Sequence, residues 1–350
     1  MNRLAALVRP LASLRLTLFL LVALAVTSAY GERGNMTWPL AIPLALLSLN
    51  LLVALCIHPA MRKTAWLFAF HLALLMLLLV AALGRLTYLK ARIEVTEGQR
   101  FDGVPVEVEQ GPWHRNRLDR IGFINDRLVI DYSPLRTITG TTNQVRWQDA
   151  SGQWQTSTLR ENEPQHIFGY RFYVTSGKGF APVFRWQPRN GNESVGAVHL
   201  PRFPSDEFAQ QTEWTLPDQR TKVWAQLLFD APVVPAGQVS QLHARQDSRV
   251  VLWISPPSTE NASSVRYALR PGEAAELPGG RLEYRELRLW MGYLVHYDWT
   301  VPWMLAISAL ATIALCGHFL SRFSVPWDGG EKTVEDTANE AITNDGPART

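Results

Sequence analysis

His71 is the residue of this 350-residue chain that is best placed to do chemistry, because it interrupts a long apolar run. The run covers residues 65–84. As a helix of about 20 residues it would cross the ~30 Å hydrocarbon core of a membrane. An ionisable ring at that depth is costly unless it faces another helix, a cavity or a bound group. A neutral imidazole is also a common ligand of metal ions and haem iron. The sequence therefore leaves two interpretations of His71: a ligand, or a hydrogen-bonding residue between packed helices.

The remaining histidines and the cysteines form no recognisable catalytic or metal-binding motif. Four histidines of the polar region lack metal-ligand spacing: His114, His166, His199 and His243. No Gly-x-Ser-x-Gly or Cys-x-x-Cys motif occurs, and the two cysteines, Cys56 and Cys316, lie in apolar runs. We therefore expect no enzymatic site in the polar region and no covalently attached cofactor.

Four apolar segments predict four transmembrane helices, at residues 12–30, 38–57, 65–84 and 299–322. The first three lie within residues 1–88. Residues 89–298 are polar enough and long enough for a domain with its own core. The basic, apolar and small residues of the first thirty positions are also compatible with a cleaved signal peptide. We favour an uncleaved helix, because the apolar stretch is long for a signal peptide.

The distribution of Lys and Arg predicts the orientation. Arg3, Arg9 and Arg15 precede the first span, Arg62 and Lys63 follow the second, and Arg322 ends the last. The positive-inside rule places these segments in the cytoplasm, so that both termini are cytoplasmic and residues 89–298 are periplasmic. The net charge of +3 is small and the basic residues are dispersed, which argues against nucleic acid as a partner.

Alternating apolar and polar residues predict a β-rich domain, a sandwich or a barrel-like fold. The expected strands lie at residues 104–108, 127–132, 144–148, 170–175, 183–187 and 265–269. Residues 249–254 are a further strand, and residues 223–229 a strand or a short helix. Turns are expected at residues 149–152, 176–179, 190–192 and 278–280.

The segment that leads into the fourth span is aromatic. Tyr293, Tyr297, Trp299 and Trp303 predict an aromatic belt at the membrane interface, with His296 beside it. His58 and His318 fall near the cytoplasmic ends of spans. The acidic residues 323–350 lack apolar periodicity and predict a disordered cytoplasmic tail.

These features together resemble the ResB-type proteins of System II cytochrome c biogenesis. The likeness is carried by the opening Leu-Ala-Ser-Leu-Arg-Leu-Thr-Leu at residues 11–18, by Leu-Leu-Ser-Leu-Asn at residues 46–50 and by Phe70-His71-Leu72. The layout also matches: three spans, a large β-rich outer domain and one last span. The tryptophan-rich haem-handling motif belongs to that family's partner, and this chain has no counterpart among its 13 tryptophans.

The resemblance implies a subunit that helps to move haem b across the bacterial inner membrane and presents it for attachment to apocytochrome c. The haem would be transported, not retained. The expected partners are a ResC/CcsA-type membrane protein, apocytochrome c and membrane lipid. His71 is the one residue that matches the family's intramembrane haem ligand, and the second axial ligand is expected from the partner. The chain would then be a non-catalytic or co-catalytic subunit of a haem lyase.

Two other functions remain open at this stage. One is a membrane-anchored adaptor or chaperone whose outer domain docks a partner, with His71 packing helices. The other is a b-type electron-transfer subunit, which would need a second histidine, such as His58 or His318, at a depth matching that of the first.

Overall fold

The chain consists of a helical unit and a β-rich unit, and the computed structural model describes most of both. The described residues are 9–29, 37–115, 118, 121–161, 163–203, 210–218, 221–243, 247–255, 265–277 and 279–323. The predicted disordered tail, apart from its first residue, lies outside them. Phe323, that first residue, is helical.

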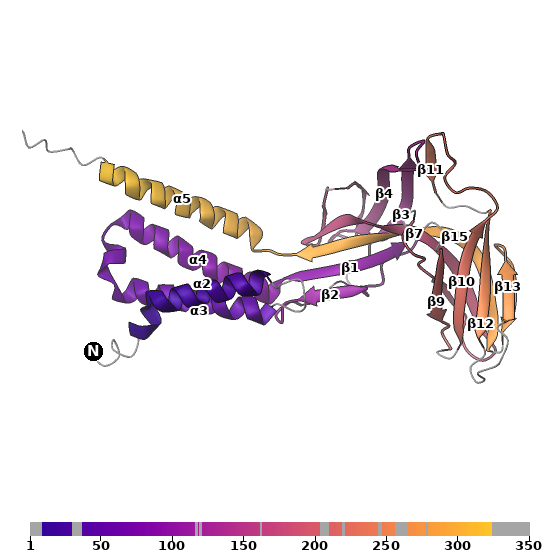
Figure 1. The fold of residues 1–350 in the computed structure, drawn as a ribbon, viewed down its shortest axis with the longest axis horizontal. Coiled ribbons are helices and arrows are strands. Elements are labelled where there is room, and N and C mark those ends of the chain that lie inside the picture. Colours follow the sequence, from indigo (N-terminus) through magenta and orange to yellow (C-terminus); the bar gives the residue numbers. More distant parts are fainter. Residues whose placement is uncertain are drawn as a thin grey trace, which may run out of the picture. The chain divides into compact units, whose positions relative to one another are not determined.

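Four apolar helices lie close to the predicted spans (Figure 1). They are α2 (Leu14–Ala29), α3 (Thr37–Ile57), α4 (Ala65–Thr87) and α5 (Val301–Phe323). Among the described residues, α3, α4 and α5 are long and apolar enough to cross a membrane. With 16 residues, α2 is about 24 Å long, shorter than the ~30 Å hydrocarbon core. Three candidate spans indicate a membrane protein, and the span at residues 12–30 stays a prediction.

Asn50 joins the start of α2 to α3 inside the apolar unit. Its Nδ2 donates to the carbonyl oxygens of Leu11 at 2.6 Å and Ser13 at 3.3 Å, and its Oδ1 accepts from Thr17 Oγ1 at 2.8 Å. The Leu11 carbonyl belongs to the short helix Arg9–Ala12 that precedes α2, and the Ser13 carbonyl already accepts from the Thr17 amide at 3.1 Å, so Asn50 adds donors to carbonyls at the junction of these two helices. Asn50 is 6% exposed, so these bonds are sheltered from water.

The β-rich unit contains fifteen described strands, all paired antiparallel within three sheets (Figure 1). They are β1 (Leu89–Thr96), β2 (Glu107–Gln110), β3 (Ile124–Tyr132), β4 (Ile138–Gln148), β5 (Trp154–Leu159), β6 (Gln165–Ile167), β7 (Tyr170–Pro188), β8 (Ser194–Ala197), β9 (Gln211–Thr215), β10 (Lys222–Phe229), β11 (Ser240–Leu242), β12 (Ser248–Ser255), β13 (Val265–Leu269), β14 (Ala274–Leu277) and β15 (Gly280–Tyr297).

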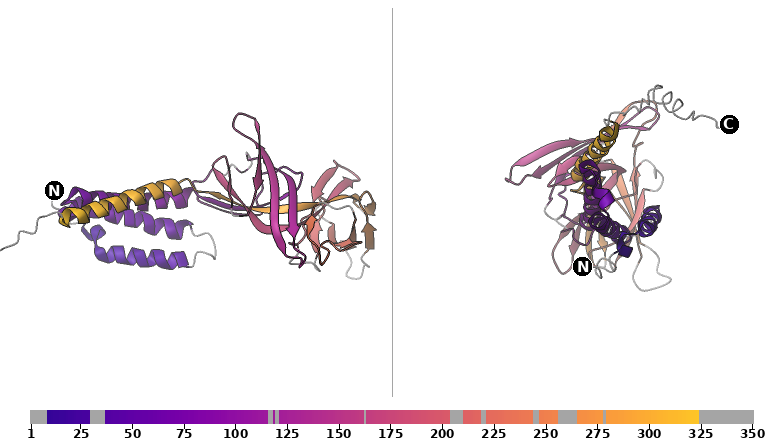
Figure 2. Two further views of the ribbon diagram at one scale, coloured as in Figure 1. Left: turned by 90° about the horizontal axis from the view of Figure 1, so that it is seen from above. Right: turned by 90° about the vertical axis from the view of Figure 1, so that its left-hand side faces the viewer.

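The long strands β7 and β15 organise this unit. They pair along most of their length in a seven-stranded sheet, in which the order β2-β1-β15-β7-β6 is joined by β8 and β14. Two four-stranded sheets, β11-β3-β4-β5 and β13-β12-β10-β9, complete the fold. Figure 2 shows β3, β4 and β5 running across the direction of β15. The inward faces of the three sheets form one continuous hydrophobic core.

Most predicted strands are confirmed, including residues 223–229, which form a strand and not a helix. Two expectations about the start of the domain need correction. Residues 104–106 are not a strand, and β2 begins at Glu107; Pro105 lacks the N–H that a strand pairing needs. In contrast, β1 was missed, although residues 89–95 alternate between the core and the surface.

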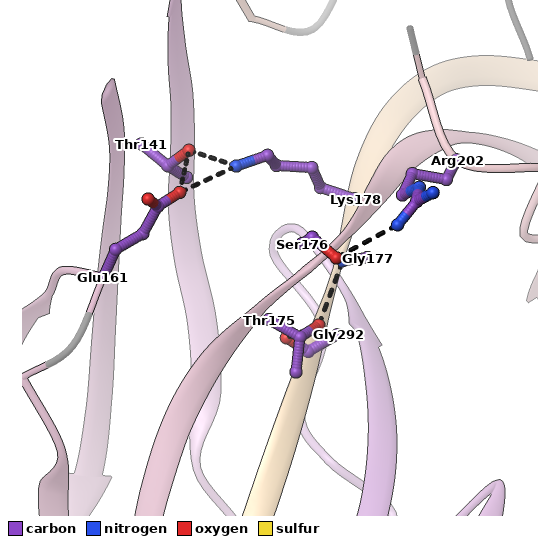
Figure 3. A network of polar contacts seen from close by, with 8 residues as sticks. All are labelled: Thr141, Glu161, Thr175, Ser176, Gly177, Lys178, Arg202 and Gly292. Carbon is purple, nitrogen blue, oxygen red and sulfur yellow. Dashed lines mark hydrogen bonds and ion pairs between the residues drawn. The ribbon is translucent and has the colours of Figure 1, made fainter. Parts of the chain in front are cut away.

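The predicted turn at residues 176–179 is wrong, because the chain continues through it as one strand, β7. Lys178 pairs with Met291 and Val174 pairs with Tyr293, so residues 175–177 form a bulge opposite Gly292. Thr175 Oγ1 stabilises the bulge, since it donates to the Gly292 carbonyl at 2.9 Å and accepts from the Gly177 amide at 3.1 Å (Figure 3).

The strand beyond the bulge directs Lys178 into the domain. Its side chain is 3% exposed, and its ammonium contacts Thr141 Oγ1 of β4 and Glu161 Oε1, the latter at 3.3 Å (Figure 3). Loss of water around the ammonium lowers the pKa of Lys178, while Glu161 opposes that shift. Lys178, which follows the bulge, thus connects the seven-stranded sheet to the sheet of β4.

Tyr293 is also placed differently from the prediction. Instead of lying in an interfacial belt, its side chain is fully buried in the core, and its hydroxyl donates to Asn143 Oδ1 at 2.7 Å. Burial raises the pKa of the Tyr293 hydroxyl. Tyr297 is partly buried, whereas Trp299 and Trp303 are 39% and 58% exposed, as belt residues would be.

Candidate functional site

His71 lies in the second turn of α4 and is partly buried. Its Nδ1 is 2.8 Å from the carbonyl oxygen of Leu67, four residues earlier. A carbonyl can only accept a hydrogen bond, so Nδ1 donates here, and in a neutral imidazole the lone pair is then on Nε2. Fixing one ring nitrogen in this way is how proteins orient a histidine that ligates a metal through the other.

A cavity of about 620 Å³ lies beside His71 within the helical unit. Its walls come from α2, α3 and α4 and from the link between the last two. The lining residues are mostly apolar: Ala12, Leu14, Thr17, Leu21, Leu47, Asn50, Leu51, Ala54, His58, Met61, His71, Leu74, Leu77 and Leu78. A volume of this size falls within the range of small-molecule and cofactor sites.

Few polar atoms of this lining remain for a ligand. The amide of Asn50 already bonds to Leu11, Ser13 and Thr17. Thr17 Oγ1 is engaged by Asn50 and lies within reach of the Ser13 carbonyl. Of the described lining residues, His71 and His58 are those with a nitrogen suited to iron, and Met61 adds a thioether. The lining can hold an apolar molecule whose metal is bound by an imidazole.

His58 and Met61 are cavity residues that the sequence analysis did not place there. His58 ends the hydrogen-bonded turn after α3, and Met61 lies in the short helix Pro59–Arg62 before α4. His71 is about 9 Å along α4 from its start, by helix rise. Because the link is short, the end of α3 and the start of α4 must meet. The short link between the two predicted spans could therefore have indicated that His58 and Met61 lie near His71.

His318 does not line this cavity. Its ring is 9% exposed, and its Nδ1 is 3.2 Å from Thr64 Oγ1. This packing removes it as a second cavity ligand for the electron-transfer alternative. Another contact between α4 and α5 is tight, since a Cβ added at Gly317 would lie 2.6 Å from the Trp66 ring.

Histidines of the β-rich unit have local partners. His199 lies between Glu94 Oε2 at 3.0 Å and Thr96 Oγ1 at 2.9 Å, and it stacks on Trp290. His114 contacts the Thr87 carbonyl at 2.9 Å and the Tyr170 hydroxyl at 3.2 Å. Among the described residues no group of three or more His, Cys, Asp or Glu side chains is arranged to hold a metal ion.

One known protein family matches most of this chain. The model of the ResB-like family matches residues 60–327, which is more than half of the chain and includes His71, the β-rich unit and α5. No protein in a search of curated proteins matches the chain.

Proposed function

Because the chain belongs to the ResB-like family, whose role is in cytochrome c biogenesis, we propose that it receives haem within the membrane and presents it with apocytochrome c for covalent attachment. The observation that carries this proposal is the position of His71. Its Nδ1 is held by the Leu67 carbonyl, and it lines an apolar cavity of about 620 Å³. Haem is the substrate of this process and leaves with the cytochrome.

The residues of the cavity suit the porphyrin ring and the iron of a haem molecule. The leucines of α2, α3 and α4 provide an apolar surface for the porphyrin ring, which water solvates poorly. Nε2 of His71 provides one axial ligand to the iron. None of the described lining residues is a tryptophan, so these residues offer no indole ring on which a porphyrin could stack.

The partner and the orientation complete the proposal. A ResC/CcsA-type membrane protein supplies the second axial ligand and the ligation chemistry, which makes this chain a non-catalytic or co-catalytic subunit. Both termini lie in the cytoplasm and the β-rich unit lies in the periplasm, as the Lys and Arg distribution predicts. His71 then lies nearer the cytoplasmic side, where haem enters.

A second candidate function is favoured by one observation: His58 and Met61 line the same cavity as His71. Histidine and methionine are both axial haem ligands. A haem bound by two residues of this chain would stay bound, as in a b-type electron-transfer subunit.

The test is the absorption spectrum of the full chain, purified with a co-expressed ResC-type partner. We expect His71→Ala to lose most of the haem absorbance while the amount of protein stays unchanged, because an intramembrane hydrogen bond contributes only about 1–2 kcal/mol. Added imidazole should restore part of the absorbance, since it supplies the same nitrogen donor.

The matched control is His318→Ala, which removes an imidazole from a membrane helix but not from the cavity. It should keep its haem. Full haem content and an unchanged spectrum in His71→Ala would refute the ligand assignment and favour an adaptor in which His71 packs helices.

A further inference from the structure

Four basic side chains lie side by side on one face of the seven-stranded sheet. The register pairs Lys90 of β1 with His296 of β15, His296 with Arg171 of β7, and Arg171 with His166 of β6. Directly paired residues of an antiparallel sheet project from the same face, and neighbouring strands are about 4.8 Å apart. We call these four residues the basic strip.

The strip lies on the solvent side of the sheet. Leu89 and Ala91, on either side of Lys90 in β1, are buried in the core, as is Val295 beside His296. Lys90 and His166 are exposed, and His296 and Arg171 are partly exposed. The strip is therefore accessible to a ligand.

Acidic groups do not neutralise the strip. Glu109 follows Lys90 in the same row, but its carboxylate accepts from the Tyr88 hydroxyl and lies 3.8 Å from Arg85. The Asp298 carboxylate accepts from the backbone amide of Thr300 at 2.9 Å and from its hydroxyl at 2.6 Å. In the described part of the chain, neither Lys90 nor Arg171 has a carboxylate within ion-pair distance.

The pKa of His296 reflects both its burial and the positive charges on either side of it. Burial lowers the pKa of its imidazole, and Lys90 and Arg171 lower it further, whereas Asp298 raises it. Tyr173 packs edge-on against its ring, with ring centroids 5.8 Å apart. A neutral imidazole between two cations can donate its N–H to a bound phosphate without adding to their repulsion.

The chain itself brings the strip close to a lipid surface. Lys90 follows the last residue of the apolar helix α4 by three residues, about 10 Å in an extended strand. The exposed Trp299 and Trp303 flank the first residue of α5 and are typical of a membrane interface. A lysine side chain three residues from the end of a span is long enough to reach the headgroup layer while its stem stays on the protein.

We propose that the basic strip binds the phosphate of an anionic phospholipid headgroup. The lipid belongs to the leaflet in which α4 ends and α5 begins. The Lys90 ammonium and the Arg171 guanidinium contact the phosphate, and His296 lies between them. The strip thereby fixes the membrane-proximal end of the seven-stranded sheet against the bilayer. This lipid binding requires that α4 and α5 cross the membrane, and it does not depend on haem binding.

The experiment is native mass spectrometry of the detergent-released full chain, titrated separately with phosphatidylglycerol, phosphatidylcholine and inorganic phosphate. We expect phosphatidylglycerol to bind more tightly than phosphatidylcholine. Lys90→Gln/Arg171→Gln should weaken phosphatidylglycerol binding about twenty-fold or more, since each basic residue near an anionic surface contributes roughly a factor of five. Binding of phosphatidylglycerol with equal affinity by the double variant would overturn the proposal.

Two double variants serve as controls: one keeps the charge of the strip, and the other removes the same charge from a different part of the surface. Lys90→Arg/Arg171→Lys keeps the charges and should keep phosphatidylglycerol binding. Lys222→Gln/Arg281→Gln removes the same net charge from exposed ion pairs with Glu213 and Glu276 and should bind like the wild type. Loss of binding in either control pair would overturn the assignment to the strip, and so would inorganic phosphate binding as tightly as the lipid.

Discussion

Nδ1 of His71 lies 2.8 Å from the carbonyl oxygen of Leu67, one turn earlier in α4. In the proposed haem site, this bond would leave Nε2 as the ring nitrogen that binds the iron. Coordination through Nε2 leaves the bond intact, whereas coordination through Nδ1 would break it. A donated bond from Nδ1 also makes the imidazole a stronger ligand, as in other histidine metal sites.

His58→Ala tests whether the second axial ligand comes from this chain. If the partner supplies that ligand, the variant co-purified with a ResC-type partner should keep its haem content and its absorption maximum. The measurement is the reduced-minus-oxidised spectrum of the complex. A shifted maximum, or loss of haem, in His58→Ala with normal protein levels would favour the second candidate function.

Tyr293→Phe should destabilise the β-rich unit by about 1–3 kcal/mol, because it leaves Asn143 Oδ1 in the core without its Tyr293 donor. The measurement is denaturant unfolding of the detergent-solubilised chain, followed by tryptophan fluorescence. Tyr267→Phe is the control: it removes a hydroxyl that donates to the Glu276 carbonyl at the surface, and its effect should be below about 0.5 kcal/mol. Equal effects of the two substitutions would contradict the core role of Tyr293.

Lys178→Met should change the pH dependence of stability. Burial makes the pKa of Lys178 in the folded chain lower than its value of 10.5 in the unfolded chain. Between these two values the unfolded chain binds more protons, so the free energy of unfolding of the wild type rises with pH there. Relative to Lys178→Met, the wild type should therefore gain stability as pH increases through this window.

The same substitution should have little effect at neutral pH. Replacing a buried charge by an apolar side chain of similar length is often neutral or stabilising, so we expect a change within about 1 kcal/mol. Thermal unfolding of both proteins at a series of pH values measures both effects. Parallel stability curves for the two proteins would show that Lys178 titrates normally in the folded chain.

Reporter fusions test the orientation. A reporter placed after Lys90 should be active on the periplasmic side and one after Arg322 on the cytoplasmic side, because the basic residues of the short segments stay in the cytoplasm. Alkaline phosphatase and green fluorescent protein fusions measure the two sides. A cytoplasmic signal after Lys90 would reverse the proposed depth of His71, and a periplasmic signal after Arg322 would contradict the proposed orientation of α5.

The sequence alone determined the helices to within a few residues and identified His71. An apolar run of about 20 residues becomes a helix of nearly the same extent, because in lipid each backbone group must find its hydrogen bond within the segment. The confirmed strands follow from the same kind of signal, a two-residue alternation that one segment carries by itself. The span at residues 12–30 shows the limit of this reasoning, since α2 is shorter than the run that predicted it.

Only the tertiary structure decided which residues meet. Ser176 and Gly177 resemble a turn, but β15 pairs with the chain on both sides of them and makes the segment a bulge. Tyrosine is a residue type typical of an interfacial belt, yet the register of β15 directs Tyr293 into the core beside Asn143. Strand register depends on partners far away in the chain, and no local pattern encodes it. For the same reason, the basic strip across β1, β15, β7 and β6 becomes visible only in the folded chain, whereas the short link between α3 and α4 already implied that His58 lies near His71.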